Sequence, residues 1–351
     1  MRIGILTFHW ATNYGAILQA YCLQEWLRVQ GHEVDILNYK PRQFDFSWAG
    51  VLFNLRKLRR LPSLIAEKKK EALLVPFREK HLNMTQRYYM AAEMSAPAAE
   101  YDLLISGSDQ VLNAYFTTHG EDEKPSAAYY LSFAEGKAKR IGYAISFGCE
   151  TYPDYAKPLA AQQINCFDAV AVREQTGLSV LDELEYKGKK CIVPDPTILY
   201  GKKLFERLNI TIPKEKKDYT CVYMLRREIH LEGNVKYIDE HHHPLTMEEW
   251  LSTIACAGRL VTNSYHGMIM ALLAHVPFVA LLEKGEEGGM NDRFATLLGR
   301  LGLAERMVTQ THNISSVMSQ PIDFGQIDKA IDAYRRVGEE YLKNVTNLCH
   351  L

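Results

Sequence analysis

The feature that most constrains this fold is a repeated alternation of short apolar runs with longer segments of helical periodicity. Near the amino end, RIGILTF (2–8) is rich in β-forming residues, and residues 13–30 carry apolar side chains at a helical spacing that stops at Gly31. A second strand-like run, EVDILNY (33–39), follows. A strand, a helix and a strand joined by tight connections define a βαβ unit, in which the two strands lie parallel in one sheet. The chain is therefore expected to have an α/β fold.

The same alternation continues along the chain. Further strands are predicted at 101–106, 140–146, 169–172, 191–193, 219–225, 259–262 and 277–281. Helices are predicted at 51–82 with a break at Pro62, and at 246–257, 265–274, 292–301 and 323–345.

The composition of the sequence changes once, at 201–218. This stretch is polar and Lys-rich and contains Pro213, a composition typical of a crossing between domains. We therefore predict two Rossmann-like domains that face a cleft, residues 1–205 and 206–351. The C-terminal helix is expected to pack back on the first domain.

Composition excludes several classes of protein. The chain has 41 Lys and Arg against 42 Asp and Glu, a net charge of −1, so it cannot hold nucleic acid by bulk positive charge. An apolar share of 47% excludes a disordered protein. No secretory signal is evident at the amino end, and the most apolar stretch, 268–282, is too short to span a bilayer. Seven scattered cysteines without a CxxC pair indicate a reducing, cytoplasmic compartment.

Parallel sheets bind ligands at the carboxyl ends of their strands, so chemistry is sought in the strand-to-helix loops. The first loop, HWATNYG, begins at His9; Asn13 can cap the following helix, and Gly15 would let backbone N–H groups approach an anion. In the second, SGSDQVLN at 106–113, capping explains Asp109 but not the polar side chains that follow it, Gln110 and Asn113. We expect these polar groups to face the cleft.

Two further loops carry charged or titratable side chains. Arg173 follows a buried strand and needs an anionic partner, which could be Glu174, Asp195, or a bound carboxylate or phosphate. The segment TNSYHG places His266 in the first turn of a helix. There the helix N-terminus disfavours the imidazolium and a bound phosphate favours it, an opposition that suits general acid–base catalysis. In NDRF, Arg293 is a second candidate anion contact, after a loop at 283–290 that is flexible by composition.

Taken together, these segments resemble the polysaccharide pyruvyl transferase family. The matching segments run in the family's order and cover nearly the whole chain: TFHWATNYGAILQAYCLQEWL (7–27), DLLISGSDQVLN (102–113), IGYAISFG (141–148), AVREQTG (171–177), PDPTILY (194–200), TNSYHGMIMALLAHVPF (262–278) and NDRF (291–294).

The resemblance implies a fold similar to GT-B glycosyltransferases, with phosphoenolpyruvate as donor. A sugar of a bacterial-type surface polysaccharide would offer two hydroxyls, giving a pyruvate ketal and phosphate. It also implies that an arginine at the position of Arg173 and a histidine at that of His266 act in donor binding and catalysis. No cofactor and no metal are expected, because the chemistry needs only a positioned acid, a base and cations.

The residue roles expected on this reading fall into three groups. The catalytic residues are His266, as the acid, and Asp109. The base is left open between His266 after its proton transfer, Asp109 and the departing phosphate. Donor-binding residues are Arg173, Ser264, Gly267, Arg293, Asn13 and Gly15, and acceptor-binding residues are His9, Gln110, Asn113 and Asn291.

Two departures from the family's pattern matter. Some members have an arginine two residues before the histidine, where this chain has Ser264, so another cation must hold the donor; Arg293 and Arg226 are the candidates. Leu112 stands where a tryptophan is common, which puts acceptor contacts in that loop in doubt.

Two alternative functions remain. A GT-B glycosyltransferase using a nucleotide sugar would share the cleft, but no base-stacking pocket or ribose carboxylate is apparent in the sequence. A non-catalytic carbohydrate-binding protein is the third interpretation. A lipid-linked acceptor would bring the enzyme to the inner face of a membrane. The basic segment 56–70 is a candidate contact with that membrane. For RKLRR (56–60), a solvated helix face is the favoured interpretation.

Overall fold

A computed structural model describes residues 1–45, 61–134, 136, 138–225, 228–240, 242–282 and 291–347. The basic run at 56–60 and Arg226 lie outside these residues. Within the described chain, no helix combines the length and the apolar character needed to cross a membrane.

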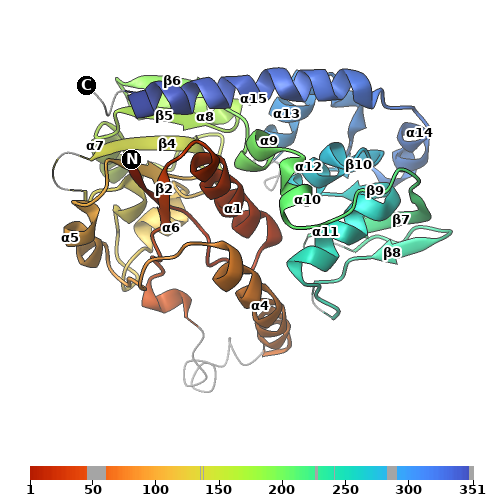
Figure 1. Cartoon of the computed structure of the whole chain (residues 1–351), viewed down its shortest axis with the longest axis horizontal. Helices are drawn as coiled ribbons and strands as arrows, with labels where there is room; N and C mark the ends of the chain where they lie inside the picture. The colour runs from red at the N-terminus through yellow and green to blue at the C-terminus, as the bar shows by residue number, and fades with distance from the viewer. Residues whose placement is uncertain are drawn as a thin grey trace.

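The chain folds into two lobes, each built on a parallel sheet (Figure 1). The sheet of the first lobe has the order β2-β1-β3-β4-β5-β6. Its strands are β1 (Arg2–Leu6), β2 (Glu33–Ile36), β3 (Leu103–Ser106), β4 (Lys139–Ile145), β5 (Ala169–Val172) and β6 (Lys189–Ile192). The sheet of the second lobe has the order β11-β10-β9-β7-β8. Its strands are β7 (Lys217–Tyr223), β8 (Val235–Tyr237), β9 (Ala257–Thr262), β10 (Phe278–Leu281) and β11 (Met307–Val308). The prediction of two Rossmann-like α/β units is confirmed.

Helices connect and cover the strands of both sheets. In the first lobe they are α1 (Tyr14–Val29), α4 (Leu61–His81), α5 (Ser95–Ala98), α6 (Ala114–Thr118), α7 (Lys157–Ile164) and α8 (Gln175–Glu183). The short helices α9 (Pro196–Tyr200) and α10 (Lys203–Arg207) follow β6. In the second lobe they are α11 (Met247–Cys256), α12 (Tyr265–Leu273), α13 (Asp292–Leu301) and α14 (Ile314–Met318), before the long final helix α15 (Phe324–Asn347).

The central strands are apolar on both faces because helices cover both sides of each sheet. Every residue of β3, β5 and β10 is buried, as expected for strands in the middle of a parallel sheet. The interdomain crossing predicted at 201–218 holds α10 and the first residues of β7. The chain between the two sheets is thus partly helical and not an extended linker.

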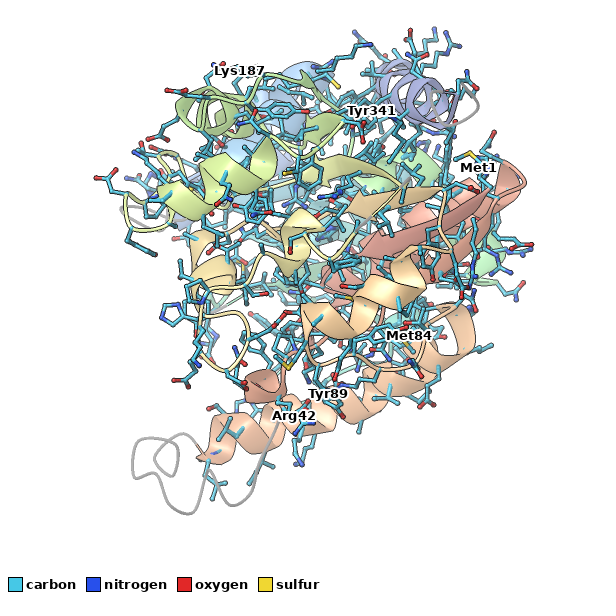
Figure 2. The ribbon with its side chains drawn as sticks, turned by 90° about the vertical axis from the view of Figure 1, so that its left-hand side faces the viewer. Met1, Arg42, Met84, Tyr89, Lys187 and Tyr341 are labelled. Atoms are coloured by element: carbon cyan, nitrogen blue, oxygen red, sulfur yellow. The ribbon has the colours of Figure 1, made fainter. Side chains whose placement is uncertain are left out.

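The final helix returns from the second lobe to the first and runs along both (Figure 1). Tyr341 of α15 donates a hydrogen bond to the Gly142 carbonyl of β4 at 2.9 Å (Figure 2). The Arg335 guanidinium donates to the Leu199 carbonyl of α9 at 2.9 Å. At the opposite edge of the first lobe, Arg42 and Tyr89 lie near each other (Figure 2), with the guanidinium carbon 4.7 Å from the ring centroid.

The register of the first sheet brings its strand-to-helix loops to one edge. Leu6 of β1 is opposite Ser106 of β3, and Ile145 of β4 is opposite Val172 of β5. The loops after these four strands therefore begin side by side at the carboxyl edge, where α/β sheets bind ligands.

Candidate anion-binding site

The site is centred on Arg173, the first residue after β5, whose side chain is fully buried. Its guanidinium lies 3.1 Å from Asp195 Oδ2, 3.3 Å from Glu174 Oε2 and 3.8 Å from Asp109 Oδ1. Burial lowers the pKa of Arg173, but the three carboxylates outweigh it and raise that pKa above its ordinary value. The arginine therefore stays charged inside the protein.

Asp195 connects the arginine to the histidine predicted as the catalytic acid. It caps α9, with Oδ1 accepting from the Thr197 amide at 2.9 Å and from the Thr197 hydroxyl at 2.7 Å. Its other oxygen, Oδ2, lies 3.4 Å from His266 Nε2. Burial alone would raise the pKa of Asp195. His266, Arg173 and Thr197 lower it by more, so the net pKa is below its usual value. Asp195 is thus an anion that lies between a guanidinium and an imidazole.

His266 lies in the first turn of α12 and packs against the start of α1. A Cβ built on Gly15 would come within 2.0 Å of His266 Nδ1, so the imidazole is in direct contact with the backbone of α1. Ser264 caps α12 by accepting from the Gly267 amide at 3.2 Å. The two lobes thereby bring a histidine of the second against a helix N-terminus of the first, where the helix dipole favours negative charge.

Arg293, in the first turn of α13, is the second cation of the site. Its guanidinium carbon is 5.5 Å from the centroid of the Tyr265 ring, and that of Arg173 is 5.1 Å from the same ring. Burial lowers the pKa of Arg293, and the charge of Arg173 lowers it further. Two guanidinium groups thus share one aromatic ring.

Three nitrogen atoms of this cluster are buried and lack a hydrogen-bond partner in the described part of the chain: Arg173 Nη2, His266 Nε2 and Arg293 Nε. A buried donor without an acceptor costs about 1–3 kcal/mol. The carboxylates compensate charge in this cluster but leave these atoms without hydrogen bonds. A ligand that brings anionic oxygens would supply them.

Two of the remaining predicted residues cap helices, and two others lie beside the cluster in the chain or in space. Asn13 caps α1 by accepting from the Ala16 amide at 3.2 Å, and Asn113 caps α6 by accepting from the Tyr115 amide at 3.0 Å. Gln110 and Asn113 both lie close to Gly148, where an added Cβ would meet their side chains at 2.9 and 2.6 Å. Asn291 directly precedes α13 and so lies beside Arg293 in the chain.

His9 is held inside the first lobe. Its ring nitrogens lie 3.1 Å from the Thr7 carbonyl oxygen and 3.0 Å from Asn38 Oδ1. Burial lowers its pKa from 6.5 to about 4. Its hydrogen-bond partners, Thr7 and Asn38, belong to the first lobe and not to the cluster around Arg173.

The sequence indicates Asp195 and Glu174 only as possible ion-pair partners of Arg173. In the structure, both are paired with it. The signal for Asp195 is its place shortly after β6, at the same sheet edge as Arg173, before a proline that starts a helix. In the described chain, no group of three or more His, Cys, Asp or Glu is arranged to hold a metal ion.

The fold and the site thus define a two-lobed α/β protein with a buried cluster of charged side chains between its sheets. Over its full length it matches solved structures, GT-B glycosyltransferases among them. UGT89C1 of Arabidopsis thaliana complexed with UDP-L-rhamnose is 9% identical, with 99% of this chain and 98% of that chain covered and a TM-score of 0.50. UDP-GlcNAc 2-epimerase from Methanocaldococcus jannaschii is 11% identical, with 99% and 100% covered and a TM-score of 0.49. The GT-B-like fold predicted from the family resemblance is confirmed by the first of these.

The family follows from the sequence. The model of the polysaccharide pyruvyl transferase family matches residues 13–284, and the chain belongs to this family. Family membership implies transferase activity. Comparison with curated protein sequences gives no match.

Proposed function

We propose that this protein transfers the enolpyruvyl group of phosphoenolpyruvate to two hydroxyls of a sugar in a surface polysaccharide, forming a pyruvate ketal and releasing phosphate. The observation that carries the proposal is the set of three buried nitrogens without a hydrogen-bond partner in the described chain, on Arg173, Arg293 and His266. Phosphoenolpyruvate presents a carboxylate and a phosphate on one small framework, so it can accept from two guanidinium groups and place its methylene carbon near an imidazole. The family of the chain supports the same donor.

The donor would be held chiefly by the two arginines. Arg173 is fixed by Asp195 and Glu174, which leaves Nη2 to donate to the ligand. Arg293 is half-buried near a like charge, and a bound anion would offset that repulsion. Arg293 therefore takes the role of the arginine that other members carry at the position of Ser264.

The reaction needs four proton transfers, two from the protein to the reactants and two from the reactants to the protein. His266, protonated at Nε2 beside Asp195, gives its proton to the methylene carbon, and the first sugar hydroxyl attacks the resulting cationic carbon. Asp109 takes the proton of that hydroxyl, because its carboxylate is 19% exposed whereas those of Asp195 and Glu174 are at most 6% exposed. The C–O bond to phosphate breaks, and Asp109 returns its proton to the phosphate. The second hydroxyl closes the ketal and reprotonates His266. Burial of the cluster keeps water from the cationic carbon.

The donor part of the proposal is tested by unfolding in the presence of ligand. At 100 times its Kd, phosphoenolpyruvate should raise the free energy of unfolding by about 2.7 kcal/mol. Arg293→Gln should lose this stabilisation, while Arg300→Gln, on the other end of the same helix, should keep it. Stabilisation by UDP and not by phosphoenolpyruvate would instead favour a nucleotide-sugar glycosyltransferase.

The chemical part is tested by phosphate release in the presence of an acceptor glycan. His266→Ala should reduce the rate by about 10²–10⁴-fold, the usual contribution of a positioned acid. His312→Ala, an exposed histidine elsewhere in the second lobe, should release phosphate at the wild-type rate. Turnover by folded His266→Ala at the wild-type rate would remove the imidazole from the mechanism.

A further inference from the structure

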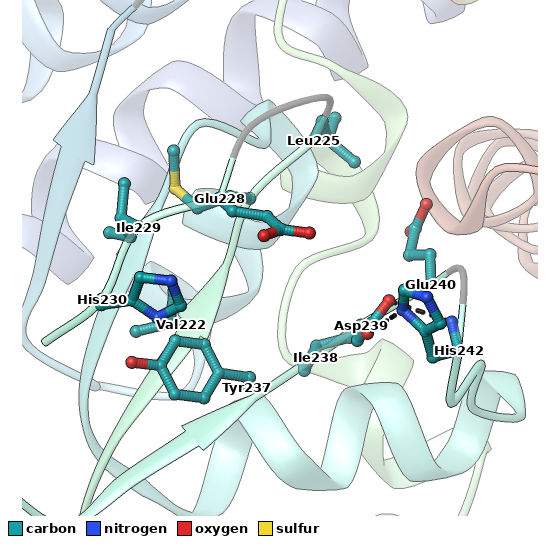
Figure 3. A pocket seen from close by; sticks show the side chains of 11 residues that line it. Val222, Leu225, Glu228, Ile229, His230, Tyr237, Ile238, Asp239, Glu240 and His242 are labelled. Atoms are coloured by element: carbon teal, nitrogen blue, oxygen red, sulfur yellow. Dashed lines mark hydrogen bonds and ion pairs between the residues drawn. The ribbon is translucent and has the colours of Figure 1, made fainter.

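The second lobe contains a cavity that the donor site does not use. It has a volume of about 580 Å³, within the range of about 300–1,000 Å³ usual for small-molecule sites. It lies at the carboxyl ends of β7 and β8, where a parallel sheet offers its ligand edge. Figure 3 shows the side chains around it, with Glu228 projecting between an aromatic side and an acidic side.

The floor of the cavity is apolar and one wall is aromatic. Val222, Ile229 and Ile238 line the floor and are buried. Tyr237 and His230 form the wall, with ring centroids 6.4 Å apart at 63°. Tyr237 is 44% exposed although it is a large aromatic residue. An exposed aromatic face beside apolar side chains suits the C–H face of a sugar ring, which is apolar while its edge carries hydroxyls.

The charged side chains of the cavity are carboxylates. Glu228, Asp239 and Glu240 line it, and the described lining contains no Lys or Arg. Asp239 is positioned by His242 at 2.6 Å, and Glu240 by Lys70 of α4 at 2.7 Å. Carboxylate oxygens accept hydrogen bonds from hydroxyls and repel phosphate groups. Three carboxylates that can accept from hydroxyls suit a polyhydroxylated ring.

The side chain of Tyr223 lies between the cavity and the segment that carries His266. Tyr223 donates its hydroxyl hydrogen to Glu240, which lines the cavity. The ring of the same tyrosine packs on Gly267, where an added Cβ would lie 3.0 Å from it, and Gly267 is the neighbour of His266. Tyr223 thus separates the cavity from the segment that carries the imidazole.

We propose that this cavity is the subsite for an uncharged glycosyl unit of the acceptor, bound by its apolar face on Tyr237 and by its hydroxyls on Glu228 and Asp239. The assignment of this unit to the acceptor depends on the proposed transfer reaction, whereas the binding of a neutral sugar ring does not. The subsite differs from the loops of the first lobe that the sequence indicated for the acceptor.

The test is saturation-transfer NMR on the full-length protein with a panel of neutral methyl hexopyranosides and methyl N-acetylhexosaminides. At least one glycoside should receive saturation from the wild type. Tyr237→Ala and Glu228→Gln should each weaken its affinity about five-fold or more. The matched controls Tyr155→Ala and Glu185→Gln remove an exposed tyrosine and an exposed glutamate of the first lobe and should leave the affinity unchanged.

The subsite would be overturned if no glycoside of the panel received saturation, or if a bound glycoside had the same affinity in the cavity variants and the controls. UDP competing for the cavity and weakened by Glu228→Gln would also overturn it, since it would assign the cavity to a nucleotide. Phosphoenolpyruvate is titrated in the same samples and should bind Tyr237→Ala as tightly as the wild type. Glycoside binding without phosphoenolpyruvate binding would leave the subsite standing and contradict only the proposed transfer reaction.

Discussion

At the scale of single residues, the position of the His266 imidazole depends on the missing side chain of Gly15. The two residues belong to different lobes, and a Cβ on Gly15 would come within 2.0 Å of His266 Nδ1. On its other side, His266 Nε2 faces Asp195 Oδ2 at 3.4 Å. The imidazole is thus confined between a helix start and a carboxylate.

Gly15→Ala should therefore impair the reaction more than the binding of the donor. The new methyl group must displace the imidazole, and misplacement by about 1 Å can cost about 10²-fold in rate. The affinity for phosphoenolpyruvate, held mainly by arginines, should fall less. Gly299→Ala is the matched control, because it is also helical, has open space around its Cβ, and should be neutral or stabilising. Phosphate release and calorimetric titration of both variants distinguish the two effects; equal rates would contradict the steric argument.

His9 gives a prediction about stability and pH. Its folded-state pKa is lowered by burial from 6.5 to about 4, so below pH 6.5 the unfolded chain binds a proton that the folded chain does not. The stabilisation is fully present above pH 6.5 and is lost as the pH falls through about 4, a total of about 3 kcal/mol at 1.36 kcal/mol per pH unit. His9→Gln should lack this part of the acid sensitivity. Urea unfolding of both proteins at pH 7 and near pH 4 measures it, and parallel losses of stability would contradict the assignment.

At the scale of the elements, the site depends on the ends of β5 and β6 and on the start of α9. These place Arg173 and Asp195 3.1 Å apart with both side chains fully buried. A pair of this kind stabilises the fold weakly, but removing one member leaves an uncompensated buried charge. The cluster is thus structurally required as well as suited to an anion.

Arg173→Met should destabilise the protein by about 3–5 kcal/mol, because Asp195 and Glu174 would lose their cation. Arg259→Met, on the exposed side of β9, should change stability by less than about 0.5 kcal/mol. Chemical denaturation compares the two variants. If Arg173→Met were as stable as Arg259→Met, the carboxylates of the cluster would not depend on the arginine for their charge compensation.

The sequence predicts inner strands better than edge strands. Ala169–Val172 and Asp292–Leu301 are found with the predicted bounds, and the former is buried on both faces. β8 (Val235–Tyr237) and β11 (Met307–Val308) were not predicted. Both are edge strands of two or three residues, and β8 is partly or fully exposed, so neither has the apolar run on which the prediction relies. Pairing with an inner strand, and not local sequence, makes them strands.

The same distinction applies to the candidate site. Asp109 and Arg173 could be predicted to lie together because both follow strands of one parallel sheet. The contact of Gly15 with His266 could not, because it depends on the way in which the two lobes approach each other. The cavity beside β8 was missed for a related reason: its lining comes from a short strand and two loops without a recognisable pattern.

At the scale of the whole molecule, the position of one lobe against the other is set by contacts of α1 and α4 with the second lobe. Tyr14 stacks on Trp250 with ring centroids 4.9 Å apart, and its hydroxyl donates to the Leu245 carbonyl at 2.7 Å. Lys70 of α4 lies 4.5 Å from the centroid of the Tyr14 ring and pairs with Glu240 at 2.7 Å. Because Glu240 also lines the cavity, this ion pair joins the lobe interface to the proposed sugar subsite.

The Lys70–Glu240 pair should therefore contribute to the association of the lobes in a way that exposed ion pairs do not. Burial lowers the pKa of Lys70, and Glu240 raises it only in part, so the charged lysine needs this partner. Lys70→Met and Glu240→Gln should each cost about 1–3 kcal/mol, since each leaves the other group partly buried without its partner. The double variant should cost less than the sum of the two by about 0.5–3 kcal/mol, the coupling usual for residues in contact.

A double-mutant cycle by urea unfolding measures this coupling. The pair Lys157–Asp154 is the control, because its nitrogen and oxygen are also 2.7 Å apart but Asp154 is 95% exposed. The cycle of Lys157→Met and Asp154→Asn should show no measurable coupling, as water screens that pair. Equal coupling in the two cycles would mean that this ion pair contributes no more to the association of the lobes than an exposed pair contributes to the fold. A larger coupling for Lys70 and Glu240 would mean that the charge on the wall of the cavity also helps to hold the two lobes together.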